Sequence, residues 1–226
     1  MLSANAVVIG MAFKNLNTEL DFIGIVDMLP PRERKTWDIT GELSRYLAGM
    51  GVEQKYKECA TNAEVFAVLR KFRELSKNSA LMLHFVSHGT ADGIAIKGSK
   101  EPLIRWDDLR SYLLELNREL GGTLIINLTS CFGFEGIRMV RAHDVELPFY
   151  GLIGCEQKLG VDDAKQVNQL LYKGIADGKE IPLVVIEIIK QYGRKVIYGR
   201  TAQIQQGMIN PTNSLELSGK ENAEPV

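Results

Sequence analysis

The chain has few cysteines, little net charge and no long apolar run, and each shortage argues against a class of protein. Its three cysteines, Cys59, Cys131 and Cys155, are odd in number and widely spaced, and no CxxC pair or Cys/His cluster accompanies them. This usage argues against a zinc site and favours a reducing, cytoplasmic setting. We expect no metal site and no cofactor.

Charge and hydropathy exclude two further classes of partner. A formal net charge of −1 over 226 residues argues against a nucleic-acid binder, which needs basic residues to neutralise phosphates. The longest apolar stretch, residues 181–189, contains Pro182 and Glu187 and is too short to span a bilayer. The first ten residues lack the basic segment that opens a signal peptide. We expect a soluble protein that binds neither nucleic acid nor membrane.

Apolar strand-like runs alternate with helical patterns, which predicts an α/β fold, a three-layer α/β/α sandwich with a mostly parallel central sheet. Strands are predicted at 6–13, 22–28, 52–59, 80–87, 123–130, 147–155 and 194–201. Helices are predicted at 38–50, 61–75, 106–120, 163–177 and 182–192. Thr61 and Glu64 predict a capping box at the start of 61–75, where Val65, Val68 and Phe72 recur at helical spacing. Pro30 and Pro31 begin a predicted charged loop, 93–98 and 102–105 form a predicted hairpin, and 132–146 is predicted as loop or short helix.

One domain accounts for the whole pattern. Residues 1–210 contain all the predicted elements and show no internal repeat. Residues 211–226 are polar and rich in Asn, Ser and Glu, so we predict a disordered tail there.

The candidate catalytic residues lie at the ends of two predicted strands. The run Leu-Met-Leu-His-Phe-Val-Ser leads to His88 and Gly89, and Leu-Ile-Ile-Asn-Leu-Thr-Ser leads to Cys131. Parallel strands open into one crevice at their carboxyl ends, so His88 and Cys131 are predicted to meet there. A His beside a Cys supplies the base that makes a thiolate nucleophile. The amides of Gly89, which has no covering side chain, and of Cys131 are the candidate oxyanion donors.

These motifs carry a resemblance. An apolar strand ending in Ser-His-Gly at 87–89, followed by one ending in Thr-Ser-Cys-Phe-Gly at 129–133, resembles the caspase-like cysteine peptidases, among them caspases, metacaspases and bacterial CHAT proteins. The order of predicted elements over 22–201 is similar to the caspase-like core, and the segments 149–154 and 164–179 resemble the CHAT version. The resemblance implies a cysteine endopeptidase acting through an acyl-enzyme, with His88 as general base and Cys131 as nucleophile. It also implies an oxyanion hole of the Gly89 and Cys131 amides.

The substrate pocket departs from the family pattern. The position two before the nucleophile is commonly acidic in metacaspases and Gln in caspases, whereas this chain has Thr129. Candidate substrate-binding residues are Thr129, Asp92 and Glu156, and the last two could form an acidic pocket for a basic side chain. The resemblance also implies a protein or peptide substrate, together with a regulatory or cleaved partner such as a bacterial defence effector.

Other interpretations stay open beside this one. Cys59 and Cys155 are predicted to be core thiols, His84 a packed core residue and His143 a surface residue. The chain could be a catalytically silent caspase-like binding module that uses the same crevice for a partner. It could also be a small-molecule enzyme on a flavodoxin-like sheet, or hold phosphate in the Gly-rich loop after Cys131.

Overall fold

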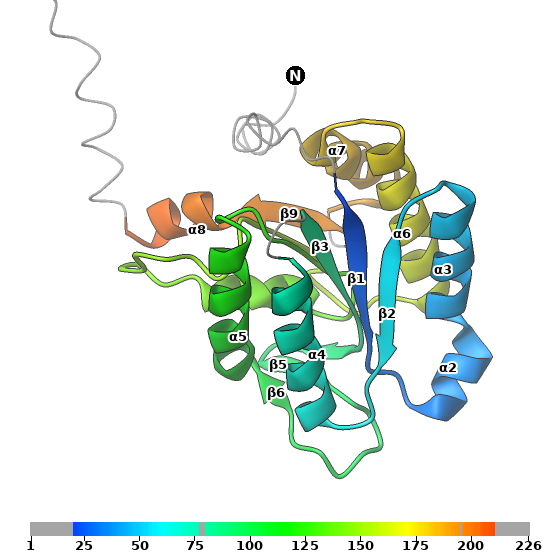
Figure 1. Cartoon of the computed structure of the whole chain (residues 1–226). Coiled ribbons are helices and arrows are strands. Elements are labelled where there is room, and N and C mark those ends of the chain that lie inside the picture. The colour runs from blue at the N-terminus through cyan, green and yellow to red at the C-terminus, as the bar shows by residue number, and fades with distance from the viewer. Residues whose placement is uncertain (1–19, 77–79, 195, 211–226) are drawn as a thin grey trace, which may run out of the picture.

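The computed structural model describes residues 20–76, 80–194 and 196–210. Its centre is a six-stranded sheet of order β2-β1-β3-β7-β8-β9, in which every neighbouring pair is parallel except β8 and β9 (Figure 1). The predicted mostly parallel sheet is therefore confirmed. Its strands are β1 (Phe22–Asp27), β2 (Gln54–Glu58), β3 (Leu81–Val86), β7 (Ile125–Leu128), β8 (Gly151–Gly154) and β9 (Tyr198–Thr201).

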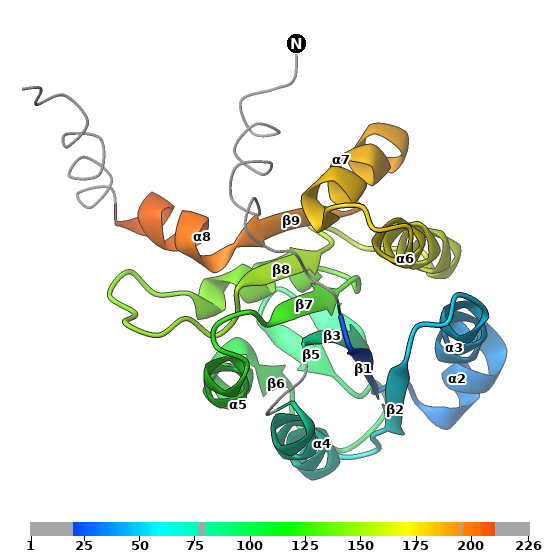
Figure 2. The ribbon, with the colours of Figure 1, turned by 45° about the horizontal axis from the view of Figure 1, so that its top comes forward.

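Helices cover both faces of this sheet, which confirms the predicted three layers (Figure 2). One face is covered by α4 (Asn62–Leu75) and α5 (Trp106–Glu119), and the other by α3 (Ile39–Gly49), α6 (Val161–Ala176) and α7 (Ile181–Tyr192). Each face has its own apolar core. Leu69 and Leu113 belong to the core under α4 and α5, whereas Leu47 and Val184 belong to the core under α3, α6 and α7.

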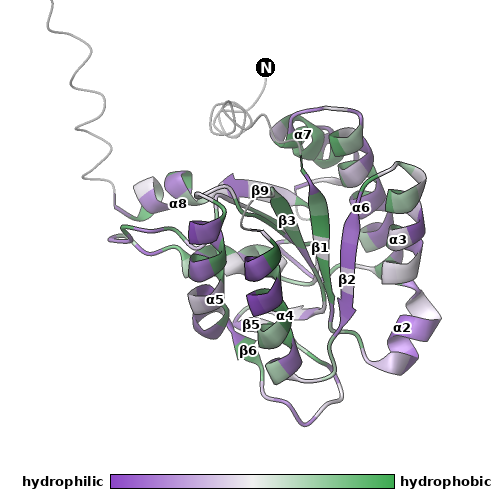
Figure 3. Cartoon of the chain, in the orientation of Figure 1, coloured by the Kyte–Doolittle hydropathy of each residue, from purple (hydrophilic) through white to green (hydrophobic). Residues whose placement is uncertain are grey.

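Burial explains the composition of the strands. All the residues of β1 and β3 are buried, as expected for parallel strands covered on both faces. The edge strand β2 is different: its central residues Lys55, Tyr56 and Lys57 are polar and at least partly exposed. Figure 3 shows this contrast as a green β1 beside a purple β2. Charged side chains on an edge strand discourage pairing with other chains.

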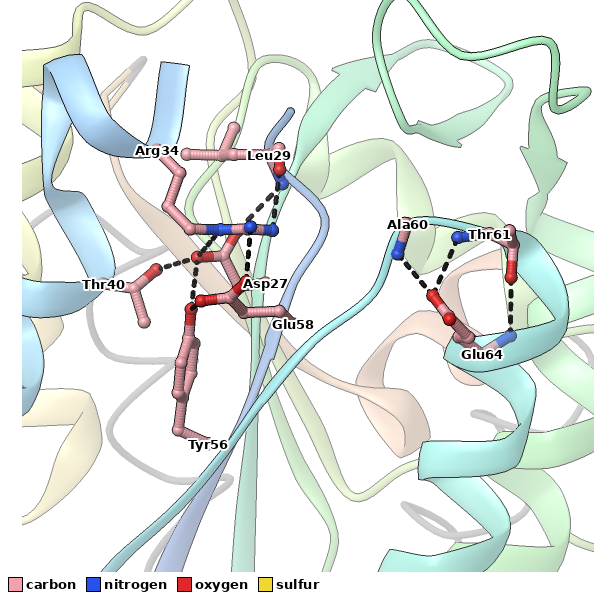
Figure 4. A network of polar contacts seen from close by, with 9 residues as sticks. All are labelled: Asp27, Leu29, Arg34, Thr40, Tyr56, Glu58, Ala60, Thr61 and Glu64. Atoms are coloured by element: carbon pink, nitrogen blue, oxygen red, sulfur yellow. Dashed lines mark hydrogen bonds and ion pairs between the residues drawn. The ribbon is translucent and has the colours of Figure 1, made fainter. Parts of the chain in front are cut away.

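The predicted capping box at the start of α4 is confirmed. The Thr61 hydroxyl accepts a hydrogen bond from the Glu64 amide at 3.2 Å, and the Glu64 carboxylate accepts one from the Thr61 amide at 3.1 Å (Figure 4). These two bonds satisfy amides that the first helical turn leaves without partners.

A second, three-stranded antiparallel sheet lies at the carboxyl end of β3. It consists of β4 (His88–Thr90), β5 (Gly93–Ala95) and β6 (Ile104–Arg105). The predicted hairpin is confirmed as β5 and β6, and β4 adds a third strand that sequence patterns did not indicate. His88 is the first residue of β4, so its backbone is fixed by pairing with Ala95.

The prediction of a charged loop after Pro30 is wrong, because Pro31–Trp37 forms the helix α2. Pro31 occupies the first helical position, where its missing N–H is not needed and its fixed φ suits the helix. Glu33 lies in the first turn, where a negative charge is favoured by the helix dipole.

Other boundaries differ from prediction. The helix α8 (Ala202–Ile209) was not predicted, and β8 and β9 are shorter than the apolar runs that indicated them. Residues Gly133–Met139 form the 3-10 helix η1, in agreement with the predicted short helix. The predicted strand at 6–13 and the predicted tail at 211–226 lie outside the described residues. Within the described ranges, no helix is both long and apolar enough to cross a membrane.

Candidate active site

The two strand ends predicted to carry the chemistry lie side by side. β3 and β7 are neighbouring parallel strands, with Leu83 paired with Ile126. The chain therefore leaves both strands at the same edge of the sheet, and His88 follows β3 as Cys131 follows β7. Open α/β sheets hold their sites at this edge, beyond the carboxyl ends of the strands.

Gly89 is the point of contact between the two segments. A β-carbon at this position would lie 1.9 Å from the carbonyl oxygen of Cys131 and 3.0 Å from the hydroxyl oxygen of Ser130. Only glycine permits so close an approach, because any side chain would overlap the turn that carries the cysteine. The backbone beside His88 is thus packed directly on the backbone of Cys131.

The Cys131 thiol is half-buried between this turn and the segment after β8. Its Sγ lies 3.4 Å from the amide nitrogen of Leu159 and 3.8 Å from the carbonyl oxygen of the same residue. The next residue, Phe132, donates its amide to the Gln157 carbonyl at 3.0 Å, which holds the two segments together. The Leu159 amide is therefore placed to donate to a thiolate at Cys131.

The backbone amide of Cys131 has no acceptor among the described residues. It lies in the turn between β7 and η1 and donates to no other residue of the described chain. Phe132 bends this turn with a left-handed φ of 56°, and the Gly133 amide closes it on the Ser130 carbonyl at 3.0 Å. A free backbone N–H beside a thiol is the type of donor that the oxyanion hole of a cysteine hydrolase requires.

His88 makes its closest polar contact with an acid. Its Nε2 lies 2.5 Å from Oε2 of Glu33, and the ring of Trp37 packs against the imidazole edge-on at a centroid distance of 5.7 Å. In the part of the chain that the structure describes, His88 and Cys131 form no hydrogen bond with each other. The second ring nitrogen of His88, Nδ1, is left free by these contacts.

Glu33 is the residue of this site that the sequence prediction missed. Its other carboxylate oxygen, Oε1, accepts from Nζ of Lys97 at 3.0 Å. Burial by itself would raise the pKa of Glu33, but the hydrogen bonds to His88 and Lys97 outweigh it and hold the pKa below its usual value. The available signal was an acid six residues after the end of β1, because β1 and β3 end at the same edge of the sheet.

Thr129 does not line an open pocket. It is 6% exposed, and its hydroxyl lies beside the side-chain oxygens of Asn127 and Asn168, the latter at 2.8 Å. Asn127 donates to Asn168 at 2.8 Å and to the Tyr172 hydroxyl at 3.2 Å. The Tyr172 hydroxyl in turn lies 2.8 Å from Nδ1 of His84. Thr129 is thus the end of a buried chain of polar side chains under the turn that carries Cys131.

His84 is a core residue, as predicted. It is 1% exposed, and burial lowers its pKa to about 3. Because Asn127 already donates to the Tyr172 hydroxyl, that hydroxyl is free to donate to His84 Nδ1, and the ring proton then resides on Nε2. Both effects keep the ring neutral.

The two acidic pocket candidates have different surroundings. Glu156 follows β8 and forms an ion pair with Arg194, with an Nη2–Oε1 distance of 3.1 Å. Asp92 is exposed at the turn between β4 and β5, and its carboxylate is in no ion pair with another described residue. Of these two candidates, Asp92 is therefore the one whose negative charge is not balanced by an ion pair with a described side chain.

The remaining thiols and the third histidine have the predicted surroundings. Cys59 and Cys155 are fully buried, and burial raises the pKa of each thiol to about 11. His143 is exposed. Across residues 20–76, 80–194 and 196–210, no group of three or more His, Cys, Asp or Glu side chains is arranged to hold a metal ion.

Comparisons with known proteins give similarity of structure without similarity of sequence. No protein-family profile matches the chain, and no curated protein matches it. It is similar to a crystal structure of drICE, with a TM-score of 0.48 and 10% identity over 83% of this chain and 90% of that one. It is also similar to Raptor from Chaetomium thermophilum, with a TM-score of 0.42 and 12% identity over 69% of this chain and 18% of that one.

Proposed function

We propose that the chain is a caspase-like cysteine endopeptidase with Cys131 as nucleophile and His88 as general base. The observation that carries the proposal is the contact between Gly89 and the Cys131 carbonyl, which fixes the histidine segment against the cysteine turn. A nucleophile, a base and a free backbone amide at one sheet edge are the parts that acyl transfer needs.

In the proposed reaction, His88 takes the proton of the Cys131 thiol and the thiolate attacks the scissile carbonyl carbon. The amides of Gly89 and Cys131 donate to the oxyanion of the tetrahedral intermediate. Collapse breaks the C–N bond, and the protonated His88 gives its proton to the leaving amine. Water then attacks the thioester, His88 accepts a proton from it, and the carboxylic product leaves Cys131.

The charges near the site favour one of the acidic pocket candidates over the other. A basic substrate side chain at Glu156 would have to displace Arg194, which already neutralises that carboxylate. Asp92 offers an unbalanced carboxylate four residues from His88. We therefore propose that Asp92 meets a basic residue of a protein or peptide substrate. The proposed setting is cytoplasmic, with a partner protein that regulates the peptidase or is cut by it.

The proposal is tested by digesting a diverse peptide library with the purified wild type and with Cys131→Ala and His88→Ala. Each substitution is expected to lower cleavage at least about a thousandfold, because nucleophile and base act as a unit. Cys59→Ala is the control, because it removes a buried thiol just beyond the edge strand β2, and it should keep cleavage. Cleavage that persists in Cys131→Ala would reject the assignment.

A binding module is the second candidate, and one observation favours it. The Cys131 thiol contacts the Leu159 backbone and His88 contacts Glu33, and no hydrogen bond joins these two side chains among the described residues. An electrophilic peptide probe separates the two candidates. A peptidase is expected to become labelled at Cys131 at a rate that His88→Ala lowers, whereas a binding module reacts slowly and equally in both proteins.

A further inference from the structure

We infer that Glu33 is the positioning residue of the site, holding His88 in the tautomer that can accept the Cys131 proton. This inference deepens the proposed peptidase function and rests on it. The carboxylate has no proton to donate at neutral pH, so at 2.5 Å it accepts the Nε2–H of His88. The lone pair of the neutral ring is then on Nδ1, the nitrogen that the described contacts leave free.

The carboxylate is held from two sides. Oε2 contacts His88 at the start of β4, and Oε1 contacts Lys97 just beyond β5, at 3.0 Å. The side chain of Glu33 is 19% exposed, so solvent screens these contacts only in part. Its lowered pKa agrees with a carboxylate that stays ionised, since both partners favour the charged form more than burial opposes it.

The helix that carries Glu33 is itself anchored. The guanidinium of the next residue, Arg34, reaches Asp27 at 3.1 Å, Glu58 at 2.6 Å and the Leu29 carbonyl at 2.8 Å (Figure 4). Asp27 is fully buried at the end of β1, and Figure 4 shows its carboxylate facing the guanidinium. Buried, multiply bonded charge pairs fix geometry, because breaking them leaves a charge without a partner.

The far end of the same helix contacts the histidine directly. The Trp37 ring meets the His88 ring edge-on at 5.7 Å and limits its rotation. Glu33 and Trp37 lie on one short helix, so α2 contacts the imidazole at two points. This arrangement suits orientation of a base, which requires both the correct nitrogen and the correct ring direction.

Glu33→Gln gives the sharpest test, because Lys97 decides how the amide orients. A lysine has only donors, so Nζ binds the amide oxygen and turns the NH2 group toward His88. Nε2 must then accept, the ring proton moves to Nδ1, and His88 can no longer take the thiol proton. In a serine protease, a wrong tautomer of the catalytic histidine lowers kcat by about 10⁴.

The experiment measures kcat, KM and the His88 tautomer in the full chain, the last by NMR of protein labelled with ¹⁵N-histidine. Glu33→Gln is expected to lower kcat by about 10² to 10⁴ with KM nearly unchanged, and to move the ring proton to Nδ1. The double variant Glu33→Gln/Lys97→Met frees the amide to rotate, so the Nε2–H tautomer and part of kcat should return. Glu42→Gln, which removes an acid paired with Lys165, is the matched control and should change neither readout.

The outcomes are distinguishable. A wild type that cleaves through Cys131, with Glu33→Gln equally active or faster, would overturn the role of Glu33 while leaving the proposed function intact. An unchanged tautomer in Glu33→Gln would also overturn it. A wild type without Cys131-dependent cleavage would overturn the proposed function and this inference with it.

Discussion

Gly89 and Cys131 pack backbone against backbone at the point where the two strand ends meet. The space that a β-carbon of Gly89 would need is occupied by the Cys131 carbonyl oxygen, 1.9 Å away. This contact sets how far the His88 segment lies from the Cys131 turn, so Gly89 has a geometric role in addition to the oxyanion role proposed for its amide.

Gly89→Ala is therefore expected to displace the His88 segment from the Cys131 turn. A misplacement of about 1 Å lowers catalysis by about 10², and overpacking costs about 1–3 kcal/mol in the free energy of unfolding. Peptide cleavage and chemical denaturation measure the two effects. Gly49→Ala is the matched control, because a β-carbon added at Gly49 would meet no neighbouring atom within 4 Å. Equal activity in both variants would contradict the prediction.

Thr129 and Ser130 are adjacent but have opposite hydrogen-bonding states. The Thr129 hydroxyl lies in a network with Asn127 and Asn168, whereas the buried Ser130 hydroxyl has no described partner. Thr129→Val is expected to lower the free energy of unfolding by about 0.5–1.5 kcal/mol, because it removes the hydroxyl hydrogen bond, although each amide oxygen keeps one N–H donor. Ser130→Ala should change it by less than about 0.5 kcal/mol. Urea denaturation of both variants checks this order, and a greater loss in Ser130→Ala would refute it.

The buried His84 predicts a pH dependence of stability. Its pKa is lowered to about 3 in the folded protein by burial, whereas the unfolded chain binds a proton on this ring near pH 6.5. The stability that comes from burying the neutral His84 ring is complete above pH 6.5. It is lost as the pH falls below 6.5, by at most about 1.4 kcal/mol per pH unit, because only the unfolded chain then binds the proton.

His84→Gln is expected to remove this contribution to the dependence of the free energy of unfolding on pH. Guanidinium denaturation at pH 7.5, 6.5 and 5.5 measures the free energy of unfolding of each protein. The variant should be less stable at pH 7.5 but lose less on acidification than the wild type does. His143→Gln, at an exposed position, should keep the wild-type slope. Equal slopes in His84→Gln and the wild type would show that the ring titrates normally.

Asp27 and Glu58 both bind the guanidinium of Arg34, which anchors α2, but the loss of each acid should change the free energy of unfolding by different amounts. Asp27 is fully buried, and the side chain of Glu58 is 54% exposed. Asp27→Asn should lower the free energy of unfolding by about 3 kcal/mol, because it removes the buried charge that faces Arg34. Glu58→Gln should cost less than about 1 kcal/mol. Similar losses in thermal or urea denaturation would contradict the proposed anchor.

The sequence predicted correctly those helices and strands whose capping residues and apolar spacing lie within a few residues of each other. The Thr61 and Glu64 capping box and the helical spacing of Val65, Val68 and Phe72 correctly placed α4. The charged segment after Pro30 misled prediction, since its seven helical residues contain no buried apolar side chain to mark a face. Its helix is held by Arg34 and Asp27, which belong to different elements.

The sequence by itself determined the layers, the parallel sheet and the two strand ends that carry His88 and Cys131, because apolar periodicity and turn residues act locally. Only the tertiary structure decided what these residues touch. It brought Glu33 to His88 across 55 positions of sequence, and it directed Thr129 into the core. Such contacts depend on how strands and helices pack, and no spacing along the chain records the direction of a side chain across a sheet.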